Sequence, residues 1–89
     1  MAIKKELEII NKRGLHARAA SKLVNIVKNY GSLVTVSKNG QKVTGSSILG
    51  LMMLAAGFGD KIIFEVSGED EQESLDAIEI LVNNRFDED

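Results

Sequence analysis

A tight turn in the middle of the chain is encoded by the dipeptide Asn39-Gly40. Asparagine followed by glycine favours a two-residue type I′ turn, because both turn positions need a positive φ. Apolar and polar residues alternate before it, over 33–37, and a short returning run follows it at 41–44. This pattern predicts two adjacent antiparallel strands, around which the other elements have to be arranged.

The remainder of the chain alternates between strand-like and helix-like patterns. Residues 3–10 and 61–66 predict two further strands. Apolar spacings of three and four residues predict a helix that starts near His16, a short helix over 48–56 and a last helix through 75–82. The order β-α-β-β-α-β-α predicts an α+β fold, an open-faced β-sandwich whose four-stranded antiparallel sheet is covered on one face by three helices.

Capping signals mark where two of these helices begin. Ser47 is expected to be the N-cap of the short helix, and Ser67 with Asp70 has the spacing of a capping box for the last helix. A helix of about two turns cannot bury every side. Some of its apolar residues are therefore expected to be exposed and adaptable in docking, namely Ile48, Leu49 and Met52.

Length and composition exclude several classes of protein. A chain of 89 residues suits one domain, which we expect to span residues 1–89. It has no cysteine, which excludes a disulfide scaffold, a thiolate zinc site and a cysteine nucleophile. The longest apolar run is about half of what a bilayer span needs, and charges interrupt the first residues. We therefore expect a cytoplasmic location and no membrane insertion.

His16 is the only histidine, and it stands where a loop passes into the first predicted helix. A helix start leaves backbone N–H groups unpaired, so the amides of Ala17 and Arg18 are expected to bind phosphate, and the Arg18 guanidinium adds a charged contact. This grouping suits a phosphoryl group that arrives on a ring nitrogen and leaves again. No second histidine completes a metal site, and no cofactor is expected. The alternative is a surface or N-capping histidine without chemistry.

Two segments carry a resemblance to a known family. The segment Asn11-Lys12-Arg13-Gly14-Leu15-His16-Ala17-Arg18-Ala19-Ala20 resembles the active-site signature of HPr, the histidine-containing phosphocarrier of the bacterial phosphoenolpyruvate-dependent phosphotransferase system. Residues 47–54 resemble the region of that family's regulatory serine. Two motifs at the family's spacing are much more specific than a lone histidine, and the likeness extends over essentially the whole chain.

The resemblance implies a stoichiometric carrier and not an enzyme. His16 would be phosphorylated on Nδ1 by enzyme I, with Arg18 beside it, and would pass the group to a IIA-type component of the phosphotransferase system. The family usually has proline directly after this arginine, where the chain has Ala19. Because alanine is a good helix former, we expect the helix to survive with a slightly looser start.

The resemblance also implies regulation and docking. Ser47 would be the serine that HPr kinase/phosphorylase modifies in species with that enzyme, and Ile48, Leu49 and Met52 would dock onto partner proteins. The chain is expected to act as a monomer. We expect the acidic residues 87–89 to be a solvated, frayed end.

Two other functions stay open on the sequence alone. The nitrogen-related or regulatory branch of the family has members with a similar acidic ending, here Phe86 to Asp89. A small nucleic-acid-binding module is the alternative from another class, because residues 1–45 hold nine Lys or Arg against two acids. Proteins that read RNA on a sheet usually stack bases on aromatic side chains, and no aromatic pair is predicted on adjacent strands. We therefore expect no nucleic-acid partner.

Overall fold

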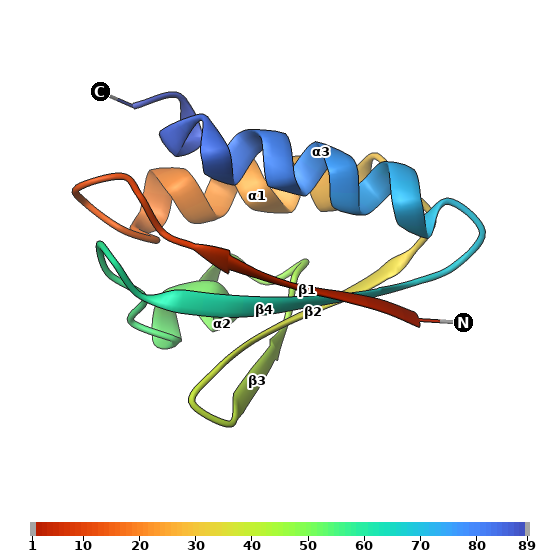
Figure 1. Ribbon diagram of the computed structural model, residues 1–89, viewed down its shortest axis with the longest axis horizontal. Coiled ribbons are helices and arrows are strands. Elements are labelled where there is room, and N and C mark those ends of the chain that lie inside the picture. The colour runs from red at the N-terminus through yellow and green to blue at the C-terminus, as the bar shows by residue number, and fades with distance from the viewer. Residues whose placement is uncertain (1, 89) are drawn as a thin grey trace.

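The computed structural model describes residues 2–88 and contains one antiparallel sheet with helices packed against it. Its elements are β1 (Ala2–Glu8), α1 (Ala17–Lys28), β2 (Leu33–Lys38), β3 (Gln41–Thr44), α2 (Ile48–Met53), β4 (Lys61–Ser67), α3 (Glu71–Asn83) and a 3-10 turn, η1 (Arg85–Asp87). The strand order is β1-β4-β2-β3. Helices α1 and α3 lie side by side over one face of the sheet, and α2 packs against α1 and β3 (Figure 1). The predicted βαββαβα fold is confirmed.

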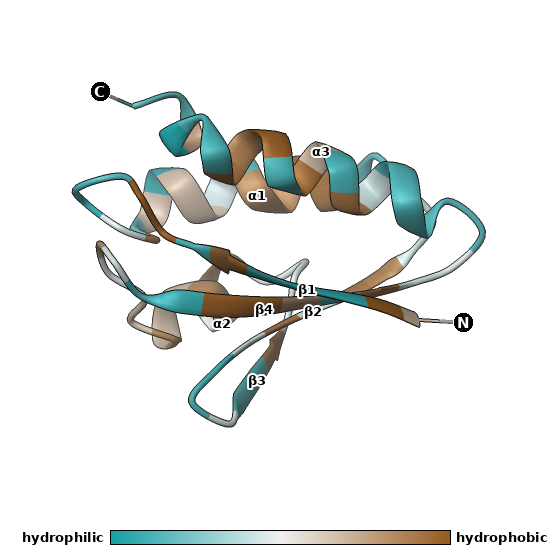
Figure 2. Ribbon diagram, viewed as in Figure 1, coloured by the Kyte–Doolittle hydropathy of each residue, from teal (hydrophilic) through white to brown (hydrophobic). Residues whose placement is uncertain are grey.

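The core lies between the sheet and the two long helices. Alternate side chains of β2 and β4 point into it, and α1 and α3 meet them with one apolar face each (Figure 2). Its largest buried side chains come from strands, helices and loops alike: Ile9, Leu23, Val36, Leu51, Ile62, Phe64, Val66, Ile78, Val82 and Phe86. Burial of such side chains removes apolar surface from water and supplies most of the driving force for folding.

The predicted hairpin forms around Asn39-Gly40. Both residues have positive φ, 51° for Asn39 and 85° for Gly40, as a type I′ turn requires. Lys38 pairs with Gln41 directly across the turn, and the register continues to Thr35 opposite Thr44. The turn residues therefore fix which side chains of β2 and β3 face each other.

The first strand and the last helix differ from the sequence-based expectation. Strand β1 ends at Glu8 and not at residue 10, because its partner β4 begins at Lys61, which pairs with Glu8. The capping box at the start of α3 is wrong, since Ser67 is the last residue of β4. The residue before the helix is Asp70, whose carboxylate accepts hydrogen bonds from the Ser32 hydroxyl and from the backbone N–H of Gly31, the latter at 2.8 Å.

Helix α2 is shorter than predicted and ends at Met53 instead of residue 56. Ala55 takes a left-handed backbone conformation with φ of 52°, which stops the helix. The ammonium group of Lys38 donates hydrogen bonds to the carbonyls of Leu54 at 3.3 Å and Ala55 at 3.0 Å. A side chain from β2 thus satisfies carbonyl groups that the helix end leaves unpaired.

Candidate functional site

His16 is the N-cap residue of α1, and its side chain makes no capping hydrogen bond to the helix. The first backbone hydrogen bond of the helix runs from the N–H of Ala20 to the carbonyl of His16 at 2.8 Å. The N–H groups of Ala17, Arg18 and Ala19 therefore precede the helical ladder and have no acceptor within it. This end of a helix also carries a partial positive charge, so it favours an anion beside the His16 ring.

The loop that delivers His16 to this position is held by the segment before β4. Leu15 donates its backbone N–H to the carbonyl of Ala56 at 2.9 Å, and Gly14 donates to the carbonyl of Asn11 at 3.1 Å. Gly14 has φ of 68°, and a Cβ atom added there would lie 2.5 Å from the Ala56 oxygen and 2.8 Å from the Gly57 Cα. The glycine in the motif thus permits a close approach of two backbones, and this contact fixes where α1 begins.

The Glu88 carboxylate reaches the His16 ring from the other end of the chain. Glu88 Oε2 contacts His16 Nε2, and Glu88 Oε1 accepts a hydrogen bond of 3.0 Å from Asn11 Nδ2. Asn11 is fully buried and also donates to the carbonyl of Gly14 at 2.8 Å. The side chains of His16 and Glu88 are each only 16% exposed. The expectation of a solvated, frayed end is wrong for Glu88, while Asp87 is exposed but belongs to the ordered turn η1, and Asp89 lies outside the described residues.

A left-handed turn after α3 directs the chain toward His16. Arg85, Phe86 and Asp87 have φ values of 55°, 53° and 62°, a conformation that costs a non-glycine residue about 1–2 kcal/mol. Phe86 compensates because its ring is fully buried. The Lys22 ammonium holds the turn from α1, donating to the Phe86 carbonyl at 3.0 Å and lying 3.7 Å from Asp87 Oδ2. Burial and charge together keep the turn in place.

A depression of about 440 Å³ beside His16 is lined by four cations and two acids: Lys12, Arg13, Arg18, Lys22, Asp87 and Glu88. Partial burial by itself would raise the pKa of the Glu88 carboxyl. The hydrogen bonds from Asn11 and His16, followed by the charges of His16 and Arg13, outweigh that effect and lower the pKa below its ordinary value. Glu88 is therefore ionised at neutral pH, and the surrounding field is positive.

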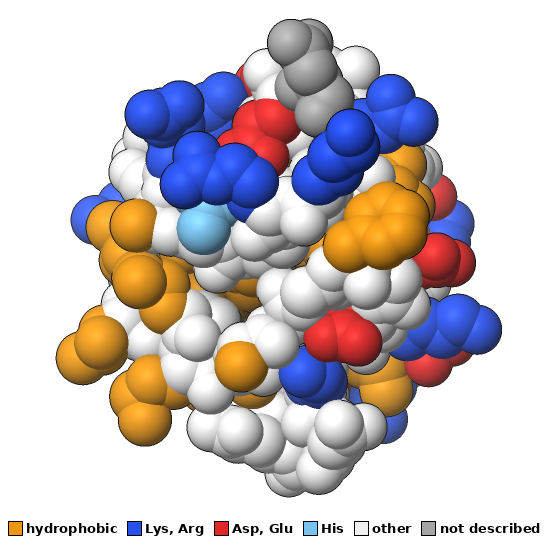
Figure 3. Space-filling view, turned by 90° about the vertical axis from the view of Figure 1, so that its left-hand side faces the viewer, with side chains coloured by type: hydrophobic (Ala, Val, Ile, Leu, Met, Phe, Trp, Pro, Cys, Tyr) orange, Lys and Arg blue, Asp and Glu red, His pale blue; other side chains and the backbone are white. Residues whose placement is uncertain are grey.

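Ser47 and the three predicted docking residues lie on α2. The Ser47 hydroxyl accepts a hydrogen bond of 2.9 Å from the N–H of Gly50, so it is the helix N-cap that the sequence predicts. Ile48, Leu49 and Met52 are 41%, 69% and 42% exposed. Figure 3 shows hydrophobic side chains gathered on one side of the histidine and Lys and Arg side chains on the other. The histidine and the apolar patch thus share one face of the molecule.

Comparison with known proteins gives a family for this arrangement. A family model described as the PTS HPr component phosphorylation site matches residues 3–84. The chain belongs to the HPr family of phosphocarrier proteins. It is 49% identical over 86 residues to the phosphocarrier protein HPr of Cupriavidus necator, covering 97% of each chain. It is 50% identical over 84 residues to HPr of Pseudomonas aeruginosa, covering 93% of each chain.

A solved HPr structure has the same fold. The crystal structure of HPr-C-His from Thermoanaerobacter tengcongensis superposes with a TM-score of 0.93 at 34% sequence identity, covering 98% of each chain. As a member of the HPr family, the chain carries a phosphoryl group and does not turn over a small substrate. The nucleic-acid-binding alternative finds no support in the sheet, since the only aromatic residue of the four described strands, Phe64, is fully buried.

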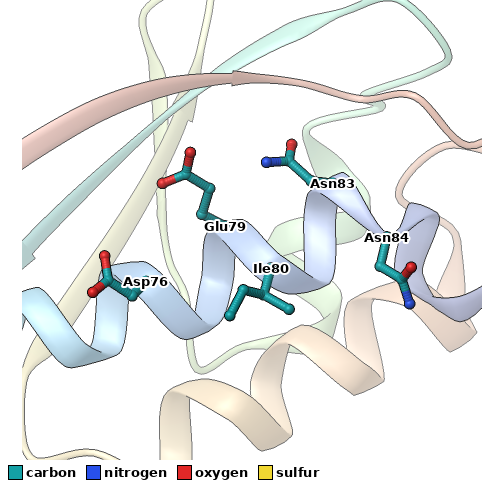
Figure 4. A pocket seen from close by; sticks show the side chains of 5 residues that line it. All are labelled: Asp76, Glu79, Ile80, Asn83 and Asn84. Atoms are coloured by element: carbon teal, nitrogen blue, oxygen red, sulfur yellow. The ribbon is translucent and has the colours of Figure 1, made fainter.

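A surface depression of about 640 Å³ lies away from the HPr motifs, on α3. Its lining residues all come from this helix and its C-cap: Asp76, Glu79, Ile80, Asn83 and Asn84. These residues follow the spacing of one helix face, and their side chains splay apart along the helix without converging on a common point (Figure 4). Glu79 is already paired with Lys5, whose ammonium lies 2.8 Å from its carboxylate. This depression has the features of an open helix surface and not of a binding site.

Residues 2–88 contain no cluster of potential metal-ligating side chains. No helix in that part of the chain is long and apolar enough to cross a membrane.

Four residues of the site escaped the sequence-based prediction: Asn11, Lys22, Phe86 and Glu88. Asn11 three residues before Gly14 is a local turn signal, so the sequence contained a hint of its role. No comparable signal marks Glu88, because its contact with His16 joins residues 72 positions apart.

Proposed function

We propose that this HPr accepts a phosphoryl group from enzyme I on His16 and passes it to IIA-type acceptors of the phosphotransferase system. The observation that supports the proposal is the position of His16 as an N-cap residue whose ring does not cap its own helix. The ring therefore stays available at a point where free backbone amides and cations favour a phosphoryl dianion. Positioning and electrostatics account for most of the catalysis of phosphoryl transfer, so a small carrier suffices.

Within this proposal, each neighbour of His16 has its own task. The N–H groups of Ala17 and Arg18 bind the phosphoryl oxygens, and the exposed Arg18 guanidinium adds a charged contact. The partner enzyme supplies the remainder of the transfer site by docking on the adjacent patch of Ile48, Leu49 and Met52. Two further exposed side chains, Met53 at 62% and Phe58 at 65%, are candidates to extend this patch.

The proposal is tested with purified enzyme I, phosphoenolpyruvate and a His16→Ala variant. Because the ring nitrogen is the only acceptor in the proposal, the variant is expected to take up no acid-labile phosphate, while the wild type takes up one group per chain. Circular dichroism checks that the variant remains folded. Acid-labile phosphate on folded His16→Ala protein would contradict the proposal.

We further propose that Ser47 is a regulatory site for HPr kinase/phosphorylase. A phosphate on this N-cap adds roughly two negative charges, which the helix start tolerates. The same charges lie next to exposed Ile48 and Leu49, where they repel an acidic partner surface and disturb apolar docking.

Replacement of Ser47 by aspartate tests this regulation. The Ser47→Asp variant keeps an N-cap oxygen and adds a charge, so it is expected to accept phosphate from enzyme I on the order of tenfold more slowly. Ser46→Asp, with the same charge one position earlier, and Ser47→Asn, which keeps a cap without the charge, are the controls. Equal rates for Ser47→Asp and wild type would reject the regulatory role.

A further inference from the structure

The contact between Glu88 and His16 determines which ring nitrogen carries the proton. Glu88 Oε2 lies against Nε2 of the imidazole, and Glu88 is ionised, so it has no proton to donate. Nε2 must then carry the hydrogen, and in the neutral ring Nδ1 is left with its free lone pair. One contact therefore selects one of the two tautomers.

Three interactions hold Glu88 in place, one at its carboxylate and two at its backbone turn. Asn11 Nδ2 donates to Glu88 Oε1 at 3.0 Å, and the buried Asn11 amide is oriented by its second bond to the Gly14 carbonyl at 2.8 Å. The Glu88 backbone N–H donates to the carbonyl of Arg85 at 2.9 Å, which closes the left-handed turn. The buried Phe86 ring anchors that turn to the core. The fold therefore holds the Glu88 carboxylate against Nε2 of His16.

We propose that Glu88 is the positioning residue of His16: it holds the proton on Nε2, leaves Nδ1 as the nucleophile and balances the charge that the ring acquires during transfer. The inference rests on the proposed function, and it adds a residue outside both sequence motifs.

Phosphoryl transfer from the donor to Nδ1 requires no proton transfer. The Nδ1 lone pair forms the new bond to phosphorus, and the bond between phosphorus and the donor atom breaks with its electron pair left on the donor. The ring keeps its Nε2 hydrogen, so it becomes a positively charged phosphoimidazolium that faces the Glu88 carboxylate. An aspartate paired with a histidine stabilises an imidazolium in serine proteases by the same arrangement. Transfer to the acceptor runs through these steps in reverse.

The 15N chemical shifts of the His16 ring test directly whether Glu88 holds the proton on Nε2. Long-range 1H–15N spectra at pH 9, where imidazole rings are neutral, are expected to show the Nε2–H tautomer in the wild type. In Glu88→Ala the two nitrogen shifts should move toward each other as the Nδ1–H tautomer becomes populated. Glu73→Ala is the control, because it removes the same charge from an exposed residue of α3 that touches neither the ring nor the turn after α3.

Single-turnover phosphorylation by enzyme I tests the second part. Glu88→Ala is expected to accept phosphate on the order of tenfold more slowly than wild type, the size of effect seen when a group that orients a functional histidine is removed. Glu88→Gln removes the charge and leaves only one acceptor oxygen, for which Asn11 and the ring compete, so it should react slowly and give a mixture of the two tautomers. Glu73→Ala should react within about twofold of wild type.

The outcomes separate this inference from the proposed function. Unchanged spectra and rates in Glu88→Ala, with wild type phosphorylated on His16, would overturn the role of Glu88 alone. A loss of rate in Glu73→Ala equal to that in Glu88→Ala would also overturn it, because the loss of an acidic charge and not the contact with the ring would be responsible. Absence of phosphate on His16 in the wild type would overturn the proposed function itself.

Discussion

Gly14 lets the loop before His16 approach the rest of the molecule more closely than any other residue could. Its φ of 68° lies in the left-handed region, and a side chain would collide with backbone atoms of Ala56 and Gly57. Backbone atoms cannot rotate aside as a flexible side chain can. The position of His16 therefore depends on a residue that takes no part in the chemistry.

Replacing Gly14 by alanine is expected to lower the free energy of unfolding by about 3 kcal/mol, which urea denaturation measures. The matched control is Gly40→Ala, where φ is 85° but nothing lies within 4 Å of the added Cβ. That variant bears the backbone cost alone and is expected to lose about 1 kcal/mol. Equal losses of unfolding free energy in the two variants would show that the close contact with Ala56 and Gly57 does not affect stability.

Single residues also show how far the sequence predicts this site. Local capping rules and the two motifs were sufficient to predict the positions of His16, Ala17, Arg18 and Ser47, because each lies within one turn of a helix start. The role of Glu88 depends on the length of α3 and on three consecutive positive φ angles, neither of which a local pattern encodes. Its acidic neighbours made a solvated end the natural expectation.

Asp70 connects two elements, because it stands at the start of α3 and binds the loop between α1 and β2. Its carboxylate accepts hydrogen bonds from the Ser32 hydroxyl and from the Gly31 N–H. These bonds, the Ser32 bond first, lower the pKa of Asp70 below its ordinary value of 3.8, against a smaller opposing effect of burial. The ends of two helices are thus tied together by one ionised group.

The Asp70→Asn variant is expected to be less stable than wild type at pH 7. A group whose pKa is lower in the folded state stabilises the protein above its unfolded pKa, and this contribution is lost as the pH falls through the folded pKa. The difference in stability between the two proteins should therefore shrink as the pH falls below about 3.8. Thermal unfolding from pH 7 to pH 2.5 measures it, with exposed Glu69→Gln as control. A difference that stays constant with pH would contradict the linkage.

The elements also show where sequence patterns fail. The apolar run 48–56 predicts three further residues of helix that the structure does not have, because the Lys38 side chain and a left-handed Ala55 end α2 at Met53. Alanine is a good helix former, so nothing in the local sequence signals this stop. The hairpin at Asn39-Gly40 was predicted correctly because its turn chemistry is local.

Phe86 anchors the segment after α3 to the core of the molecule, and its ring is buried although it follows the last long helix. Phe86→Ala is expected to lower the free energy of unfolding by about 3 kcal/mol and to release Glu88 from His16. Phe58→Ala, at a ring that is 65% exposed, makes the same chemical change and should alter stability by less than about 0.5 kcal/mol. Urea denaturation and hydrogen exchange at residues 84–88 measure both effects. Similar losses in both variants would contradict the anchoring role.

The sheet order β1-β4-β2-β3 has a consequence for synthesis on the ribosome. The strand made first, β1, is bonded only to β4, and residues 9–60 separate the two. At a translation rate of 5–20 residues per second, β4 is synthesised about 3–10 s after β1. During that interval the nascent chain can pair β2 with β3 and form α1, but it leaves β1 without a partner. Closure of the sheet, and with it the final position of the loop that carries His16, is therefore a late step in the folding of each new chain.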